Sequence, residues 1–432
     1  MSYLRGTQLL YMMHTCRALY AAGAPYLLQS PVVLRSRARI LSFCRYILIE
    51  PSRFDLLRSL EIRAPGRFET GPKADLFLAM LTHAKRLEEL KILDTEILMS
   101  HERIASSLAA LTSLRSIIFP ALNEAACKVL HYSRSSLEKV EISFWSDETL
   151  CPGDPVPLLS RFAHSLCELR VTYAEFLCHD IQYPKVDTLF VDDCRFALAQ
   201  PIVACFPNVR DLSLWTGQED EDLEEEEIEE HRQANIQAQK IVRWNCIQHL
   251  RGDIRSLYLL GLVCQVEHLD VHSAFLTASR ADQLSSLLSE GQPFALSIRI
   301  RVSEVNSTAI HRALCSNKDS LARLTIYVDY SDETAPGDWD SAGQCIDFLG
   351  SILDHSSITH LVVHFSSRDP EVDPLGLLDL NRLAEVAVQH GPLVQYIILM
   401  DRNDEPARFW EVTSEPRTLL MLDTAEVLTR LQ

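Results

Sequence analysis

The chain has 432 residues, 47% apolar and 23% charged, so it is long and apolar enough to bury a sizeable core. Its 59 acidic and 41 basic side chains leave a formal net charge of −18, which disfavours binding to nucleic acids and to anionic membranes. Ten of the acids lie within residues 219–230, so the acidity is mostly one local feature.

The cysteine and hydropathy patterns indicate a cytoplasmic or nuclear protein. Its 12 cysteines include no C-x-x-C pair and are too sparse for a disulfide scaffold, so reduced thiols are expected. The longest apolar runs are too short to cross a bilayer, and no membrane partner is expected. Residues 1–26 make a poor signal peptide, because Gln8, His14 and Thr15 interrupt the apolar stretch.

Residues 8–30 form the first predicted element, an amphipathic helical segment in which Leu9 and Met13 recur at helical spacing. The same letters resemble the second half of an F-box, in which a leucine helix leads into a T-C-R-A-L stretch and an A-G-x-P-x-L-L connection. The first half of that motif is missing from this sequence. The matching residues are Leu10, Met13, Cys16, Arg17, Leu19, Pro25, Leu27 and Leu28.

The F-box resemblance implies that residues 1–50 dock on the small linker subunit of an SCF-type cullin-RING ubiquitin ligase. The docking residues that it implies are Leu10, Met13, Cys16, Arg17 and Leu19. Residues 1–50 have a second interpretation, a helical cap over the open end of a repeat array, which terminal repeats require.

From residue 57 onward, three apolar residues recur at relative positions 0, 3 and 5, thirteen times between Leu57 and Val394. The alternation of a short strand puts positions 3 and 5 on one face and positions 2, 4 and 6 on the other. Helical patterns fill the intervals, so stacked strand–helix units are expected to bury their apolar faces against each other. Examples are the triplets Val186/Leu189/Val191, Ile254/Leu257/Leu259, Ala295/Ile298/Ile300 and Leu321/Leu324/Ile326.

The period resembles the leucine-rich repeat L-x-x-L-x-L-x-x-N/C-x-L, which the repeat from Val186 to Phe196 fits throughout. The resemblance implies an α/β fold, a right-handed leucine-rich-repeat solenoid with a concave parallel sheet and helices on the convex side. About 13 irregular repeats would span residues 51–432, and repeats this irregular follow F-boxes in many fungal proteins. The widest interval lacks Gly and Pro from 224 to 250, which predicts an exposed acidic helical insertion at 218–250.

Motifs for catalysis or cofactor binding are missing from the sequence, which has no G-x-G-x-x-G, G-x-x-x-x-G-K-[ST], G-x-S-x-G or H-E-x-x-H. The pairs His268/His272 and His360/His364 have spacing that suits zinc on a helix, but both fall on predicted strands. Four strand residues span about 13 Å, too far for one metal ion. We therefore expect neither an enzyme nor a metal or cofactor site.

The inner positions 2, 4 and 6 supply two candidate groups for binding a protein substrate. Exposed aromatic anchors are expected on three successive strands, at Phe190, Trp215 and Tyr258. A basic cluster on two adjacent repeats would bind an acidic or phosphorylated stretch of the partner; it comprises Arg299, Arg301 and Arg323, with Tyr327 beside them. Two alternatives remain. The inner positions of irregular repeats could tolerate any residue because they face solvent, or Glu304 or Asp329 could neutralise the basic cluster.

Two functions remain from the sequence. The first is a substrate-recognition adaptor of an SCF-type ubiquitin ligase, whose repeats bind the substrate. The second is a leucine-rich-repeat scaffold or interaction protein with no ubiquitin-ligase link.

Overall fold

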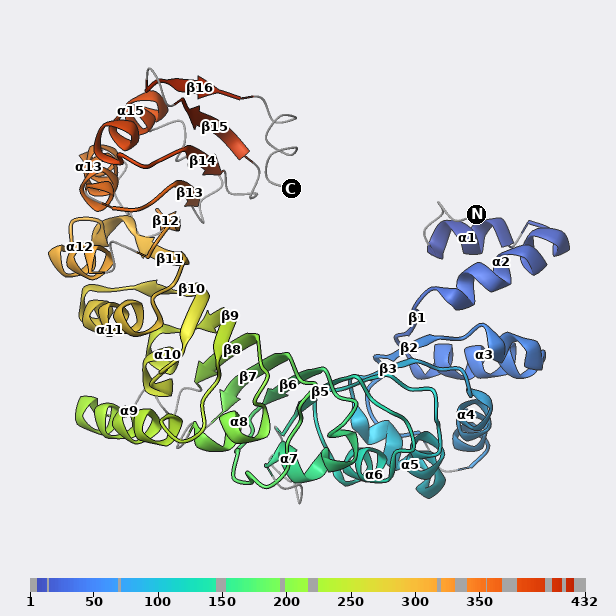
Figure 1. Cartoon of the computed structure of the whole chain (residues 1–432). Helices are drawn as coiled ribbons and strands as arrows, with labels where there is room; N and C mark the ends of the chain where they lie inside the picture. The colour runs from blue at the N-terminus through green and yellow to red at the C-terminus, as the bar shows by residue number, and fades with distance from the viewer. Residues whose placement is uncertain are drawn as a thin grey trace. The chain divides into compact units, whose positions relative to one another are not determined.

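The computed structural model describes residues 6–13, 15–68, 71–144, 153–194, 199–216, 224–316, 320–330, 340–354, 356–366, 379–400, 406–413 and 417–422. The chain divides into two units. Unit 1 is Met1–Phe196 with Pro201–Val209, and unit 2 is Ala197–Gln200 with Arg210–Gln432. In both units strands alternate with helices along the chain (Figure 1).

The sheet of unit 1 contains strands β1 to β7, which pair in parallel and in sequence order. The elements of the chain up to residue 209 are α1 (Gly6–Met13), α2 (Arg17–Gln29), β1 (Val32–Leu34), α3 (Arg37–Leu48), β2 (Ser59–Ile62), α4 (Pro72–His83), β3 (Glu89–Ile92), α5 (Glu102–Ala109), β4 (Ser116–Phe119), α6 (Glu124–Tyr132), β5 (Lys139–Ser143), α7 (Pro155–Leu158), β6 (Glu168–Thr172), β7 (Thr188–Cys194) and α8 (Gln200–Cys205).

The sheet of unit 2 is parallel and in sequence order from β8 to β14, and then β15 and β16 run antiparallel. Its elements are β8 (Asp211–Thr216), α9 (Glu225–Gln239), β9 (Cys246–Gly252), α10 (Ile254–Leu260), β10 (Gln265–Leu276), α11 (Ala281–Gly291), β11 (Ala295–Arg301), α12 (Thr308–Cys315), β12 (Arg323–Asp329), α13 (Asp340–Leu353), β13 (His360–Ser366), α15 (Leu380–His390), β14 (Tyr396–Met400), β15 (Pro406–Val412) and β16 (Leu419–Met421).

The predicted α/β alternation and mostly parallel pairing are confirmed. Twelve of the thirteen triplets place their second and third residues on a strand, the exception being the one that starts at Ile254. Leu189 and Val191 are fully buried, whereas Phe190 between them is half-buried. Positions 3 and 5 therefore face the core under the helices. We call the opposite side of each sheet, which carries positions 2, 4 and 6, the open face.

Both ends of the predicted array differ from the expectation. β1 lies inside residues 1–50, which were predicted to be only helical, and pairs with β2. The triplet pattern missed it because Gln29 occupies position 0, where an apolar residue was required. At the other end the parallel order stops at β14, because β15 and β16 reverse direction.

The predicted insertion at 218–250 is a helix followed by a strand. The helix, α9, ends at Gln239, and β9 begins at Cys246 and continues the parallel sheet. The strand escaped the triplet pattern because its positions 0, 3 and 5 are Ile247, Leu250 and Gly252, and glycine has no apolar side chain. Residues 217–223 of the acidic run lie outside the described residues.

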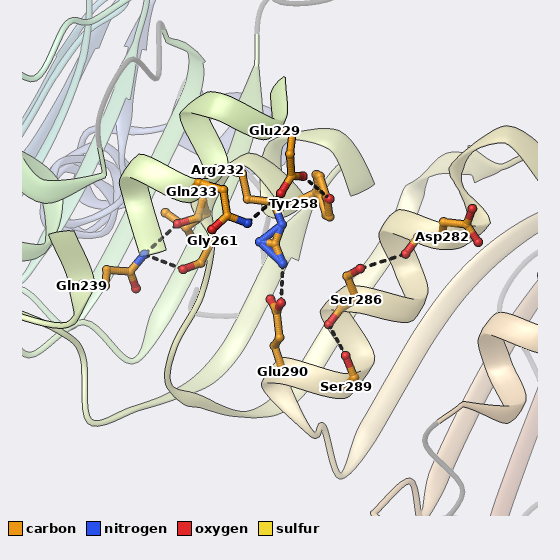
Figure 2. Close-up of polar contacts among 11 residues, drawn as sticks. Glu229, Arg232, Gln233, Gln239, Tyr258, Gly261, Asp282, Ser286, Ser289 and Glu290 are labelled. Carbon is orange, nitrogen blue, oxygen red and sulfur yellow. Dashed lines mark hydrogen bonds and ion pairs between the residues drawn. The ribbon is translucent and has the colours of Figure 1, made fainter. Parts of the chain in front are cut away.

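α9 packs against the rest of unit 2 through buried polar side chains, whereas an exposed helix was predicted (Figure 2). Asn235 donates to the carbonyl of Leu259 at 2.8 Å, and Gln239 donates to the carbonyls of Leu260 and Gly261 at 2.7 and 2.9 Å. These carbonyls end α10 and would otherwise lack intrahelical partners. The hydrogen bonds therefore hold α9 against α10 where an apolar face would normally do so.

Candidate functional site

Charged side chains on the open face of unit 1 neutralise one another across neighbouring strands. Glu168 of β6 accepts from Lys139 of β5 at 2.9 Å and from Arg170 at 2.8 Å. Burial alone would raise the pKa of Glu168, but the bonds from these two cations outweigh it, and the pKa lies below its usual value. The Arg170 guanidinium also lies 3.9 Å from the centroid of the Phe190 ring. This part of the face has internal partners for its charges.

Tyr258 is not a member of an aromatic strip, and its prediction as an inner-strand anchor is wrong. It lies on α10, where its hydroxyl donates to Glu229 of α9 at 2.7 Å and the Arg232 guanidinium lies 4.3 Å from its ring centroid (Figure 2). Burial, followed by the bond to Glu229, raises the pKa of Tyr258 to about 12, so the phenol keeps its proton. Phe190 on β7 and Trp215 on β8 do lie at half-buried open-face positions, in unit 1 and unit 2 respectively.

The predicted cluster of three arginines is also not formed. Arg299 pairs in register with Tyr327 and Arg301 with Asp329, whereas Arg323 pairs with Ala295. Arg323 therefore lies four residues, about 13 Å, along the sheet from Arg299.

The arginines near Tyr327 already have intramolecular partners. Arg299 forms an ion pair with the buried Asp329 at 2.8 Å, which agrees with the alternative that Asp329 neutralises these arginines. The guanidinium groups of Arg299 and Arg301 lie 5.1 and 4.6 Å from the centroid of the Phe275 ring. Tyr327 stacks on His364 with ring centroids 4.1 Å apart. The His364 ring thus covers one side of the Tyr327 ring. His360 and His364 both lie on a strand, β13, as predicted.

A different set of side chains lies at one register position across six strands of unit 2. We call it the Arg323 row, which consists of His249, His268, Ala295, Arg323, His360 and Tyr396. The rings of His249 and His268 stack with centroids 4.7 Å apart, and those of His360 and Tyr396 lie 5.0 Å apart. Arg323 is exposed, its guanidinium lies 5.6 Å from the Phe294 ring centroid, and it forms no ion pair with any described residue.

A hollow of about 100 Å³ opens on the same face over β9, β10 and β11, and Arg323 on β12 is not part of its lining. Its lining includes His249, His268 and Ala295 of the Arg323 row and Arg251, Asp270 and Ser297 one step along the strands. It exists because β11 contributes the small side chains of Ala295 and Ser297, while the neighbouring strands carry larger ones. Arg251 and Asp270 approach to 3.9 Å and offset each other's charge.

The electrostatic surroundings keep two histidines of the Arg323 row neutral near pH 7. Burial, then His249, then Arg323 lower the pKa of His268 below its usual value. Burial and then Arg323 lower the pKa of His360 in the same way. Removing water and adding a nearby positive charge both disfavour the imidazolium form. Around neutral pH, Arg323 therefore carries a positive charge while His268 and His360 are neutral.

The antiparallel end of unit 2 has a second, small apolar cluster on the side of the open face. Ile398 of β14, Phe409 of β15 and Leu422 form a small buried cluster, against which Val362 and Tyr396 pack. Ile398 occupies position 4, so this cluster lies on the open face and not in the core beneath the helices. The Arg323 row thus ends at Tyr396, which packs against this buried cluster.

The residues implied by the F-box resemblance lie on a pair of helices, α1 and α2, and in the turn between them. Met13 is 4% exposed and packs against Ala24 and Leu27. It is therefore buried within the chain, and its prediction as a docking residue is wrong. Cys16 and Arg17 are exposed and Leu19 is half-buried. Leu10 lies on α1, but its side chain lies outside the described residues.

The described residues contain no group of three His, Cys, Asp or Glu side chains that would suit a metal ion. Within the described ranges, we also find no helix with the length and apolarity needed to traverse a bilayer. The second histidine of the pair His268/His272 has its side chain outside the described residues. No family model matches the chain, and no curated protein is significantly similar to it in sequence.

Proposed function

We propose that the chain is an irregular leucine-rich-repeat solenoid that binds a protein segment on the open face of unit 2. The repeat assignment is supported by the 0, 3 and 5 spacing together with the strand–helix alternation and parallel order in both units. Crossovers between parallel strands are almost always right-handed, which favours a right-handed array.

The observation that carries the proposal is the contrast between the two open faces. In unit 1 Glu168 pairs with Lys139 of the adjacent strand and with Arg170 of its own strand. In unit 2 Arg323 is exposed and has no ion-pair partner among the described residues, and it lies between two pairs of packed rings. Arginine and aromatic side chains around a partly desolvated centre are the residue types that dominate protein–protein affinity.

A photo-crosslinking experiment tests which surface binds a partner. With p-benzoylphenylalanine at Tyr327, on the open face, the full chain should crosslink a discrete protein in native cell extract. The same group at Ile241, an 84% exposed residue beyond the end of α9, serves as the control in unit 2. Capture from Tyr327 that disappears when Arg323 and Tyr396 are replaced by alanine would support the proposal. Equal capture from both positions, or capture from Ile241 alone, would contradict it.

The ubiquitin-ligase adaptor function is the second candidate, and it is favoured by the exposed residues of α1 and α2. Tyr11 is 77% exposed, and Cys16 and Arg17 flank the turn between the helices. An exposed aromatic side chain beside a cation is a common anchor for a partner. Under this proposal the open face of unit 2 binds the substrate while α1 and α2 bind the linker subunit.

Co-purification of the full chain with the linker subunit tests the adaptor function. Wild-type protein should retain the linker, and the double variant Tyr11→Ala/Arg17→Glu should retain at least about tenfold less, since about 1.4 kcal/mol of lost binding gives this ratio. Thermal melting should be unchanged because both side chains are exposed. If wild-type protein retains no linker, the scaffold function without a ligase link is the better description.

A further inference from the structure

A groove of about 400 Å³ lies between the neighbouring helices α4 and α5, on the helix-covered side of unit 1 (Figure 1). Thr82 and Lys85 form its flank at α4. Among the residues that the structure describes, the lining combines two cations and four hydroxyl groups with no carboxylate, although the whole chain carries a net charge of −18. The flank at α5 consists of Arg103, Ser106, Ser107, Ala110, Leu111 and Thr112.

The cations and two of the hydroxyl groups in this groove have no internal partner in the described part of the chain. Lys85 and Arg103 are exposed, and neither forms an ion pair with another described residue. Ser106 and Thr112 are also exposed, and their hydroxyl groups form no hydrogen bond within the described ranges. An acceptor from outside the chain can therefore bind these donors without displacing an internal one.

The acids of α4, α5 and α6 face away from this groove. Asp75 of α4 lies 3.7 Å from His101, and Glu124 of α6 forms an ion pair with Lys128 at 2.7 Å. Glu102 of α5 lines a second groove, on the other side of that helix. The backbone carbonyls at the C-terminal ends of α4 and α5 carry a partial negative charge. An anion in the first groove would therefore be held by its two cations and not by the helix ends.

The second groove, of about 230 Å³, lies between α5 and α6 and continues the first. Ser106 and Ala110 line both grooves, so the two are joined across small side chains on the outer surface of α5. The second groove also contains Arg134 and Tyr132, which is 62% exposed. A peptide segment suits this path better than a compact ligand, because an extended chain occupies both grooves at once.

We propose that the groove between α4 and α5 binds a phosphorylated serine or threonine of a partner protein, whose chain crosses α5 into the second groove. Near pH 7 a phosphate monoester carries about two negative charges, which the charges of Lys85 and Arg103 match. A carboxylate carries only one and would leave a cation without a partner. The hydroxyl groups of Ser106 and Thr112 supply further donors for the phosphate oxygens. This site is independent of the open face of unit 2.

The test uses the full chain and a fluorescein-labelled decapeptide of glycine and alanine with one central phosphoserine. Binding is measured by fluorescence anisotropy at about 0.15 M salt. The phosphopeptide should bind at least about tenfold more tightly than its serine counterpart, and at least about fivefold more tightly than its glutamate counterpart. Lys85→Gln/Arg103→Gln should weaken binding of the phosphopeptide at least about tenfold. Thermal melting should be unchanged, because both side chains are exposed.

Arg86→Gln/Arg115→Gln is the matched control, because it removes the same charge from exposed positions of unit 1 outside both grooves. It should bind the phosphopeptide like wild type. Equal losses in the two double variants, or equal binding of the phosphoserine and glutamate peptides, would overturn the inference.

Competition against the labelled phosphopeptide tests the occupant. Unlabelled phosphopeptide should compete at least about tenfold better than inorganic phosphate, because only the peptide reaches the second groove. Competition by both at the same concentration would show that the anion alone is bound, and it would overturn a partner segment as the occupant. Crosslinking from Tyr327 reports on unit 2, so this site can fail while the proposed function holds.

Discussion

Replacing Gly252 by alanine should destabilise unit 2 by about 3 kcal/mol or more. Gly252 ends β9, and a Cβ atom there would lie 2.2 Å from the carbonyl oxygen of Leu214 on β8. It would also lie 3.0 Å from a methyl group of Leu257. A backbone oxygen cannot rotate away like a side chain, so the clash can be relieved only by separating two paired strands.

Denaturant unfolding of the Gly252→Ala variant, followed by circular dichroism, measures the effect. Gly153→Ala is the control, because a Cβ atom there would meet its nearest neighbour, the amide nitrogen of Glu175, at the ordinary contact distance of 3.8 Å. The control should unfold close to wild type. Wild-type stability of Gly252→Ala would mean that β8 and β9 are farther apart than the structure has them.

Leu189→Ala should lower the free energy of unfolding by about 2–5 kcal/mol. Leu189 is fully buried on β7, in register with the equally enclosed Leu169 of β6, so truncation leaves a cavity under the helices. Phe190→Ala, one residue along the chain, should cost only about 1 kcal/mol, because its ring is half-buried and contacts the Arg170 guanidinium.

The pair of variants tests the strand register directly by denaturant melts under identical conditions. A larger loss for Leu189→Ala agrees with a core-facing position 3 and an open-face position 4. Equal losses, or a larger loss for Phe190→Ala, would show that the two faces of β7 are exchanged.

The strands were predictable because the triplet pattern requires apolar residues at positions 0, 3 and 5, and a strand that buries one face usually meets all three requirements. The same strictness explains the misses. Gln29 hid β1, and Gly252 hid β9, where a strand approaches too closely for any side chain. The apolar run after Gly252 then satisfied the spacing by chance, so Tyr258 was placed on a strand although it belongs to α10.

The Arg323 row could not be found from the sequence because a period of two does not fix the register between strands. Leu296, Ile298 and Ile300 of β11 are all buried, so positions 3 and 5 are apolar in two frames that differ by two residues, and Pro293 at position 0 hid the observed one. The predicted frame began at Ala295, but Leu296 is the register partner of Leu324. That shift keeps every side chain on its face and moves Arg299 by one full pleat, away from Arg323.

The attachment of α9 was missed for a different reason. Its sequence is acidic at the start and lacks an apolar stripe, which is typical of a solvated helix. Its contacts are made by Asn235 and Gln239 instead, whose partners are the carbonyls at the end of α10. Hydropathy patterns do not detect a helix that is held by amide hydrogen bonds to backbone carbonyls.

The first and last strands of the chain have a bearing on self-association. β1 and β16 contain three residues each, and they pair with β2 and β15 respectively. A strand at a sheet edge presents unpaired N–H and C=O groups that can template the addition of another chain, and its hazard grows with its length. Three residues offer few such groups. Growth of one molecule onto another through these edges is therefore discouraged, a form of protection against aggregation built into the end strand of each unit.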